Sequence, residues 1–161
     1  MKKALLAAAV VLAADQASKQ ATLAFFDGKP KLSVELTSFF NYVLAWNKGV
    51  SFSMFHSDGP LTPWILIAVS LAICAVVFRW MKAEKDPFIR LSFGLILGGA
   101  IGNVVDRAHY GAVIDFLDFY WGRYHWPAFN VADSAICTGA GFILIKSLFF
   151  TPPETSKEIS S

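Results

Sequence analysis

Acidic and amide side chains occur in this chain within or beside stretches that are otherwise strongly apolar. Asp15 and Lys19 lie in the first such stretch, Asn103 and Asp106 near the end of another, and Asp133 near the start of the last. An ionisable side chain inside a spanning helix is costly and marks a functional site by default. Two carboxylates held close together share one proton, so that one acts as a base on water while the other acts as an acid on a carbonyl. These residues allow aspartyl-protease chemistry.

The composition indicates a small polytopic membrane protein. Of 161 residues, 55% are hydrophobic and only 16% are charged, whereas a soluble domain carries about 25% charged residues. The net charge of +2, without a basic stripe, argues against a nucleic-acid partner. The chain has two cysteines, too few for a disulfide framework, and its histidines lack metal-ligand spacing. We therefore expect no metal and no cofactor.

Four stretches are long and apolar enough to span a bilayer, which takes about 20 residues. They are residues 4–26, 61–81, 88–108 and 131–150. The first stretch follows Lys2 and Lys3 as a secretory signal would, but Asp15 and Gln16 occupy the place of a cleavage site. We therefore interpret it as a retained helix. Residues 1–151 then form one membrane domain, and residues 152–161 are predicted to be a disordered cytoplasmic tail.

Lysine and arginine predict the orientation. With the N-terminus inside, the cytoplasmic segments hold eight of them and the outer loops four (inside Lys2, Lys3, Arg79, Lys82, Lys85, Arg90, Lys146 and Lys157; outside Lys29, Lys31, Lys48 and Arg123). Both termini are therefore predicted to be cytoplasmic. The acids and amides of three helices then converge near the outer face.

Two outer segments connect these helices. Residues 27–60 show partial alternation of apolar and polar residues, which predicts short strands on the membrane surface. Residues 109–130 are crowded with aromatic rings, which we interpret as an interfacial belt. Gly94, Gly98 and Gly102 recur every four residues and predict a close helix-packing face.

Each polar residue also has a purely structural interpretation. Asp15 and Lys19 can neutralise each other at i,i+4 spacing, and Asp133 can cap the start of its helix. Asp106 can pair with Arg107. Convergence of three helices at one depth favours function over these separate explanations.

Spacing alone leaves two carboxylate pairs open. Asp115 and Asp106 both precede Asp133 at distances that one loop can bridge. Arg107, next to Asp106, is expected to keep that acid ionised and unsuited to proton sharing. Asp115 stands between apolar neighbours, which favours it as the partner of Asp133.

The chain resembles the lipoprotein signal peptidases (signal peptidase II), a family of bacterial membrane aspartyl peptidases. The resemblance runs from about residue 5 to 150 and rests on five strings in the family's order. They are Ala14-Asp15-Gln16 with Lys19, Asn47-Lys48-Gly49-Val50-Ser51-Phe52, Gly98-Gly99-Ala100-Ile101-Gly102-Asn103-Val104-Val105-Asp106-Arg107, Val113-Ile114-Asp115-Phe116, and Pro127-Ala128-Phe129-Asn130-Val131-Ala132-Asp133-Ser134.

This resemblance implies an all-α membrane protein with four transmembrane helices, plus a small extracytoplasmic β-sheet and a surface helix in residues 27–60. It implies removal of signal peptides from prolipoproteins before a diacylglyceryl-modified cysteine, by Asp115 and Asp133. Residues matching the family's supporting positions are Asp15, Lys19, Asn47, Gly49, Asn103, Asp106, Arg107 and Asn130. We expect a monomer in the bacterial inner membrane, in contact with lipid, with its active site near the outer face and no cofactor.

Two other functions compete with this one. In a small proton-coupled transporter, Asp15, Lys19, Asp106 and Asp133 would form a relay, but residues 61–81 carry almost no polar group to extend it. A structural membrane subunit would need only the glycine face and the aromatic belts. That interpretation leaves the cluster of outer carboxylates unexplained.

Overall fold

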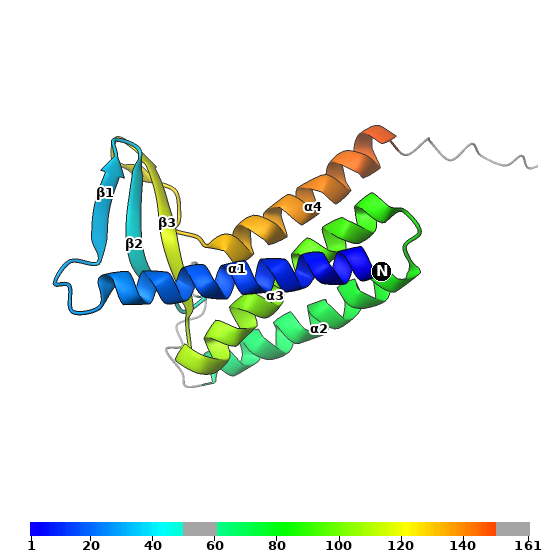
Figure 1. The fold of residues 1–161 in the computed structure, drawn as a ribbon, viewed down its shortest axis with the longest axis horizontal. Coiled ribbons are helices and arrows are strands. Elements are labelled where there is room, and N and C mark those ends of the chain that lie inside the picture. Colours follow the sequence, from blue (N-terminus) through cyan, green and yellow to red (C-terminus); the bar gives the residue numbers. More distant parts are fainter. Residues whose placement is uncertain (50–60, 151–161) are drawn as a thin grey trace, which may run out of the picture.

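The computed structural model describes residues 1–49 and 61–150, which form four long helices and one antiparallel sheet (Figure 1). The helices are α1 (Lys2–Phe26), α2 (Thr62–Ala83), α3 (Pro87–Tyr110) and α4 (Val131–Phe150). The strands are β1 (Ser33–Thr37), β2 (Phe40–Asn47), β3 (Val113–Trp121) and β4 (Tyr124–His125). All four apolar stretches therefore form helices, and the observed ends differ from the predicted ones by at most two residues.

Helix α3 is the centre of the bundle and packs against α1, α2 and α4. Its glycines allow α1 to approach closely, since a Cβ atom at Gly98 would lie 2.5 Å from the carbonyl oxygen of Ala8. Gly94 likewise faces the backbone of Ala4, and Gly102 faces the carboxylate of Asp15. The predicted glycine packing face is thus confirmed as the contact between α1 and α3.

The bundle has polar groups inside and apolar groups outside. On α1, Asp15, Lys19 and Thr22 are fully buried, whereas Leu6 and Val10 are exposed. Helices α2, α3 and α4 are each long and apolar enough to cross a membrane, judged by length and composition. Such an arrangement is favourable when the surroundings are lipid, because buried polar groups then find partners within the protein.

The sheet has the strand order β1-β2-β3-β4 and lies at one end of the bundle. Figure 1 shows its strands running crosswise to α1. The N-terminus, the α2–α3 connection and the end of α4 lie at the opposite end. At its end of the bundle the sheet contacts α1 and α3.

The interpretation of residues 109–130 as an aromatic belt alone was incomplete, since β3 and β4 belong to this segment. Strand β3 is buried on both faces over most of its first half. A strand buried on both faces lacks the alternation of apolar and polar residues that marks a half-buried strand, so β3 was not predicted from that alternation.

The turn between α3 and β3 depends on Gly111. This residue caps α3 with a left-handed φ of 71°, and its N–H donates to the Arg107 carbonyl at 3.0 Å. Only glycine adopts that conformation without steric cost. The turn directs the chain straight from the end of α3 into the strand that carries Asp115.

Two predictions fall partly or wholly outside the described residues. Within residues 27–49 the structure has strands and no helix, and the rest of the segment for which a surface helix was expected, residues 50–60, lies outside the described residues. The predicted tail, residues 152–161, is also outside the described ranges.

Candidate active site

Asp115 lies on β3 and is almost completely buried. Opposite it on β2 is Ala45, so Asn47, two residues further along, faces the same side of the sheet. The Asn47 Nδ2 donates to the Asp115 Oδ2 at 3.0 Å. The backbone N–H of Gly49 in turn donates to the Asn47 Oδ1 at 2.8 Å and holds the amide in place. Gly49 has a φ of 83°, which explains a glycine at this position.

Asp133 reaches the same region from the first turn of α4. The chain before this helix returns alongside β3, where the N–H of Phe129 donates to the Leu117 carbonyl at 3.0 Å. Asn130 then caps α4, because its Oδ1 accepts from the Asp133 N–H at 2.9 Å. The Asp133 Oδ2 accepts from the Asn130 N–H at 3.3 Å, which completes a reciprocal capping box. The structural interpretation of Asp133 as a helix cap is therefore confirmed in part: Asn130 is the N-cap, and Asp133 completes the box from the third residue of the helix with its Oδ1 left for other partners.

Asn130 connects the two carboxylates. Its Nδ2 donates to the Asp115 Oδ1 at 2.7 Å, while its Oδ1 and N–H contact Asp133. Asn103 on α3 adds a second link, since its Nδ2 donates to the Asp133 Oδ1 at 2.8 Å. The Asn103 Oδ1 accepts from the Asn130 Nδ2 at 3.3 Å. Asp115, Asp133, Asn103 and Asn130 thus form one hydrogen-bonded group, which we call the carboxylate–amide group.

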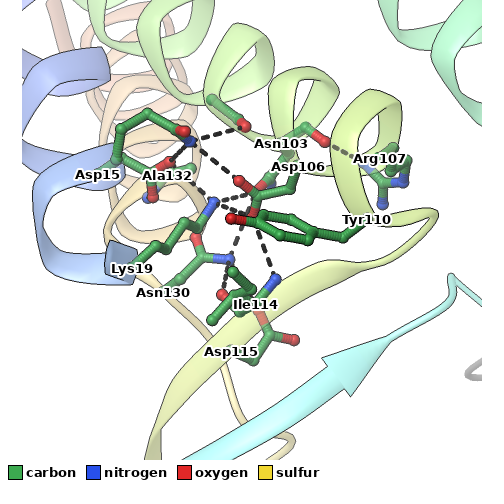
Figure 2. Close-up of polar contacts among 12 residues, drawn as sticks. Asp15, Lys19, Asn103, Asp106, Arg107, Tyr110, Ile114, Asp115, Asn130 and Ala132 are labelled. Atoms are coloured by element: carbon green, nitrogen blue, oxygen red, sulfur yellow. Dashed lines mark hydrogen bonds and ion pairs between the residues drawn. The ribbon is translucent and has the colours of Figure 1, made fainter. Parts of the chain in front are cut away.

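A buried ion cluster adjoins this group (Figure 2). The Lys19 Nζ lies 2.8 Å from Asp15 Oδ2 and 2.8 Å from Asp106 Oδ2, and it donates to Asn103 Oδ1 at 3.1 Å. An ammonium group has three protons, so each finds one acceptor. Asp15, Lys19 and Asp106 are all fully or almost fully buried. The expected Asp15–Lys19 pair is confirmed, with Asp106 as its third member.

The ion cluster ties together elements that are distant in sequence. The Asp15 Oδ1 accepts from the Ala132 N–H at the start of α4, at 2.9 Å. The Asp106 Oδ2 accepts from the Ile114 N–H at the start of β3, at 3.1 Å. Gln16 was not among the predicted site residues, yet its Nε2 donates to the Asp106 Oδ1 at 3.0 Å. The sequence signal for Gln16 as a site residue was its position directly after Asp15, in the first string shared with the family.

The predicted pairing of Asp106 with Arg107 is wrong, because the cation at Asp106 is Lys19. Consecutive residues of a helix point in directions about 100° apart and do not face each other. The Arg107 Nη1 instead donates to the Asn103 carbonyl at 3.4 Å. Its buried Nε has no hydrogen-bond partner among the described residues.

Burial raises the pKa of the Asp115 carboxyl from its usual 3.8 to about 6. The negative charge of Asp133 also raises this pKa, whereas the hydrogen bonds from Asn47 and Asn130 and the charge of Lys19 lower it. Burial outweighs those contacts, because taking a carboxylate out of water disfavours its charged form. Asp115 is therefore a carboxyl that can hold a proton at mildly acidic pH.

The carboxylate–amide group can position two carboxylates, Asp115 and Asp133, toward one substrate bond. The two carboxylates differ in their burial. Asp115 is buried, whereas Asp133 is partly accessible. Among residues 1–49 and 61–150, the structure has no group of three or more His, Cys, Asp or Glu side chains that could hold a metal ion.

Comparison with known proteins identifies the relatives of this fold. It is similar to a solved structure titled "Bacterial membrane enzyme structure by the in meso method at 2.3 A resolution", with a TM-score of 0.79 and 26% identity. The match covers 99% of this chain and 96% of the other. The fold is therefore that of a helical membrane enzyme.

Sequence comparison specifies the family. The family described as "Signal peptidase (SPase) II" matches residues 7–149. A lipoprotein signal peptidase of Shewanella loihica is 42% identical over 140 residues, covering 86% of this chain and 81% of the relative. One from Aeromonas hydrophila is 44% identical over 134 residues, covering 81% and 79%. The chain belongs to the signal peptidase II family.

Proposed function

We propose that this protein is an aspartyl endopeptidase that removes signal peptides from diacylglyceryl-modified prolipoproteins, cutting before the lipidated cysteine. The observation that carries the proposal is the bridge made by Asn130 between Asp115 and Asp133. Family membership supports the peptidase activity and the prolipoprotein substrate. The paired carboxylates support the aspartyl mechanism.

In this mechanism the pair carries one proton at rest. Asp115 holds it, because burial raises the pKa of this carboxyl to about 6. Asp133 takes a proton from the attacking water, and the protonated Asp115 donates to the oxygen of the scissile carbonyl. On collapse of the tetrahedral intermediate the C–N bond breaks, Asp133 gives the proton it took from water to the leaving amine, and the hydroxyl formed from the carbonyl oxygen returns its proton to Asp115. Asn130 and Asn103 keep both carboxylates in position throughout.

Asp15, Lys19 and Asp106 serve as positioning residues in this account. Every polar atom of the Asp106 side chain already has a partner within the fold. Both oxygens of this carboxylate are therefore occupied within the fold, and neither is left to contact a water molecule or a substrate. This supports Asp115 over Asp106 as the partner of Asp133.

We propose that α1 is a fourth transmembrane helix. Its 25 residues extend over about 37 Å at 1.5 Å each, more than the roughly 30 Å hydrocarbon core. Its low hydropathy arises from residues such as Asp15 and Lys19, which face α3 and not lipid. The distribution of lysine and arginine supports cytoplasmic termini, so the sheet and the active site lie at the outer face. The protein acts as a monomer in the inner membrane.

The test is incubation of the purified protein in detergent with a diacylglyceryl-modified prolipoprotein and, as the matched control, with the unmodified precursor. We expect a shortened product from the modified precursor and far slower cleavage of the other, since the lipid anchors the substrate by about 0.8 kcal/mol per buried CH₂. Equal rates would contradict the proposed substrate class.

The same assay tests metal independence. Because the proposed chemistry uses only carboxylates and a water molecule, EDTA should leave the rate unchanged. Loss of activity in EDTA with recovery on adding zinc would show that the aspartyl mechanism is wrong.

A further inference from the structure

An open hollow lies between the start of α3 and the later turns of α4, and the peptidase mechanism does not use it. Its volume is about 480 Å³, and it is lined by Phe88 of α3 and by Phe142, Ile145 and Lys146 of α4. We call these four residues the inner groove. The groove belongs to the end of the bundle that is remote from the sheet, where the N-terminus and the α2–α3 connection also lie (Figure 1).

The ammonium group of Lys146 can accept a further partner. Its Nζ donates to the Asp86 Oδ2 and lies 5.5 Å from the centroid of the Phe88 ring. An ammonium group has three protons, and within the described part of the chain Asp86 is the one acceptor that this Nζ contacts. The Lys146 side chain is 32% exposed, so a molecule outside the bundle can approach the remaining N–H groups.

Positive charge predominates around this end of the bundle. Asp86 partly serves α3, because its Oδ1 accepts from the N–H groups of Phe88 and Ile89, at 2.8 and 3.3 Å. The start of a helix also carries the positive end of the helix dipole. The charged residues that the structure describes at this end are the cations Lys2, Lys3, Arg79, Lys82, Lys85, Arg90 and Lys146, and the acids Glu84 and Asp86.

We propose that the inner groove binds one anionic phospholipid, with the lipid phosphate at the Lys146 Nζ and an acyl chain against Phe88, Phe142 and Ile145. The lipid comes from the leaflet at this end of the bundle. The inference rests on the proposed function only for the membrane orientation, which makes this leaflet the cytoplasmic one.

The chemistry of the groove fits this ligand better than a simpler one. A soluble anion would contact Lys146 but would leave the apolar side chains uncovered, whereas an uncharged chain would cover them without giving Lys146 an acceptor. An anionic phospholipid does both. Basic residues near the surface of an anionic leaflet gain about 1 kcal/mol each.

The depth of Lys146 also fits a lipid phosphate. Lys146 contacts Asp86, the residue directly before α3, and therefore lies at the level where that helix begins. A spanning helix begins at the boundary of the hydrocarbon core, beside the polar headgroups. A lysine stem can follow an apolar surface while its ammonium group stays at this boundary.

The test is native mass spectrometry of the full chain in detergent. The probes are phosphatidylglycerol, which is anionic, and phosphatidylcholine with the same acyl chains, which is zwitterionic. We expect one phosphatidylglycerol molecule to be retained in preference to phosphatidylcholine. In Lys146→Gln the affinity for phosphatidylglycerol should fall about fivefold, equivalent to about 1 kcal/mol for one basic residue, whereas Lys146→Arg should keep it.

The matched control is Lys82→Gln, which removes an exposed cation at the same end of the bundle. Lys82 lies on α2, with its Nζ 5.9 Å from the centroid of the Phe78 ring, and does not line the groove. Its loss should leave the affinity for phosphatidylglycerol unchanged. The apolar part is tested by Ile145→Trp, which fills the groove and should weaken binding although Lys146 is intact.

Equal retention of the two lipids by the wild type would overturn the proposal, and so would unchanged phosphatidylglycerol binding in Lys146→Gln. Displacement of the lipid by glycerol phosphate would show a site for anions alone, and a lipid-free dimer would assign the groove to a second copy of the chain. If Lys146→Gln does not fold in thermal unfolding, the lipid preference of the wild type and the effect of Ile145→Trp still decide. Cleavage is not measured in any arm, so failure here is distinct from failure of the peptidase assay.

Discussion

At the scale of single residues, Asn130 links the two acidic residues of the candidate site. Its amide group donates to Asp115 and accepts from the Asp133 backbone, so one side chain sets the position of both. The sequence placed Asp115 and Asp133 in matching strings but left Asp106 as a competing partner by spacing. The contact that favours Asp115 in the proposed mechanism joins Asp106 to Lys19, 87 positions earlier, and it arises only when α1 packs on α3.

The pH dependence of kcat/KM tests the residue-scale account. We expect kcat/KM to fall on the alkaline limb of its pH profile with an apparent pKa near 6, because activity is lost when the shared proton leaves Asp115. This apparent pKa belongs to the pair of carboxylates. The hydrogen bond from Asn47 stabilises the ionised form and lowers this pKa. In Asn47→Ala the pKa rises, and the limb should move to higher pH.

The matched control is Asn41→Ala, which removes an amide–carboxylate contact between the same two strands, at Asp118. Its limb should stay where it is in the wild type. An unchanged limb in Asn47→Ala, or equal shifts in both variants, would contradict the assignment of the proton to Asp115.

At the scale of elements, the existence of the four helices was predictable because each is a long apolar run, whereas the sheet was predicted only in part. Strands β1 and β2 lie in the segment whose alternation predicted them, but β3 lacks alternation because its first half is buried on both faces. Helix α3 was also predicted to offer a glycine face, which α1 occupies. The partner of that face depends on tertiary packing and could not be obtained from local sequence.

The junction of α1 with α3 is sensitive to added volume at Gly102. A Cβ atom there would lie 2.5 Å from the Asp15 Oδ2, which is bonded to Lys19. Gly102→Ala should therefore displace the ion cluster and lower the free energy of unfolding by about 1–3 kcal/mol. Gly141→Ala on α4, where nothing lies within 4 Å, is the control and should not destabilise. Equal stability of both variants in detergent unfolding would show that the close approach is not required.

Lys19 offers a stronger test of the same junction. Lys19→Met leaves the buried carboxylates of Asp15 and Asp106 without their cation, at a cost of about 3–5 kcal/mol. Lys29→Met removes an exposed ammonium group that lies over the Phe25 ring, which should cost no more than about 1 kcal/mol. If thermal unfolding showed equal losses for the two variants, the ion cluster would not be a main stabilising contact.

At the scale of the whole molecule, the bundle supplies a polar interior and the sheet closes one end of it. Asp115 comes from the sheet and Asp133 from a helix, so the candidate site exists only where the two parts meet. Composition predicted the membrane class, and the matching strings predicted the family. The capping box and the amide bridges follow from the return of residues 127–130 beside β3, a long-range pairing that no local pattern encodes.

The most direct test of the central claim is cleavage of the modified prolipoprotein per folded molecule by Asp115→Asn, Asp133→Asn and Asp106→Asn, with thermal stability measured in parallel. Asparagine is nearly isosteric with aspartate but cannot exchange the proton. The first two variants should remain folded and lose at least about 10²–10⁴-fold in rate. Asp106→Asn should chiefly lose stability and retain turnover in the molecules that stay folded. A folded but inactive Asp106→Asn together with an active Asp115→Asn would show that the catalytic pair is Asp106 with Asp133.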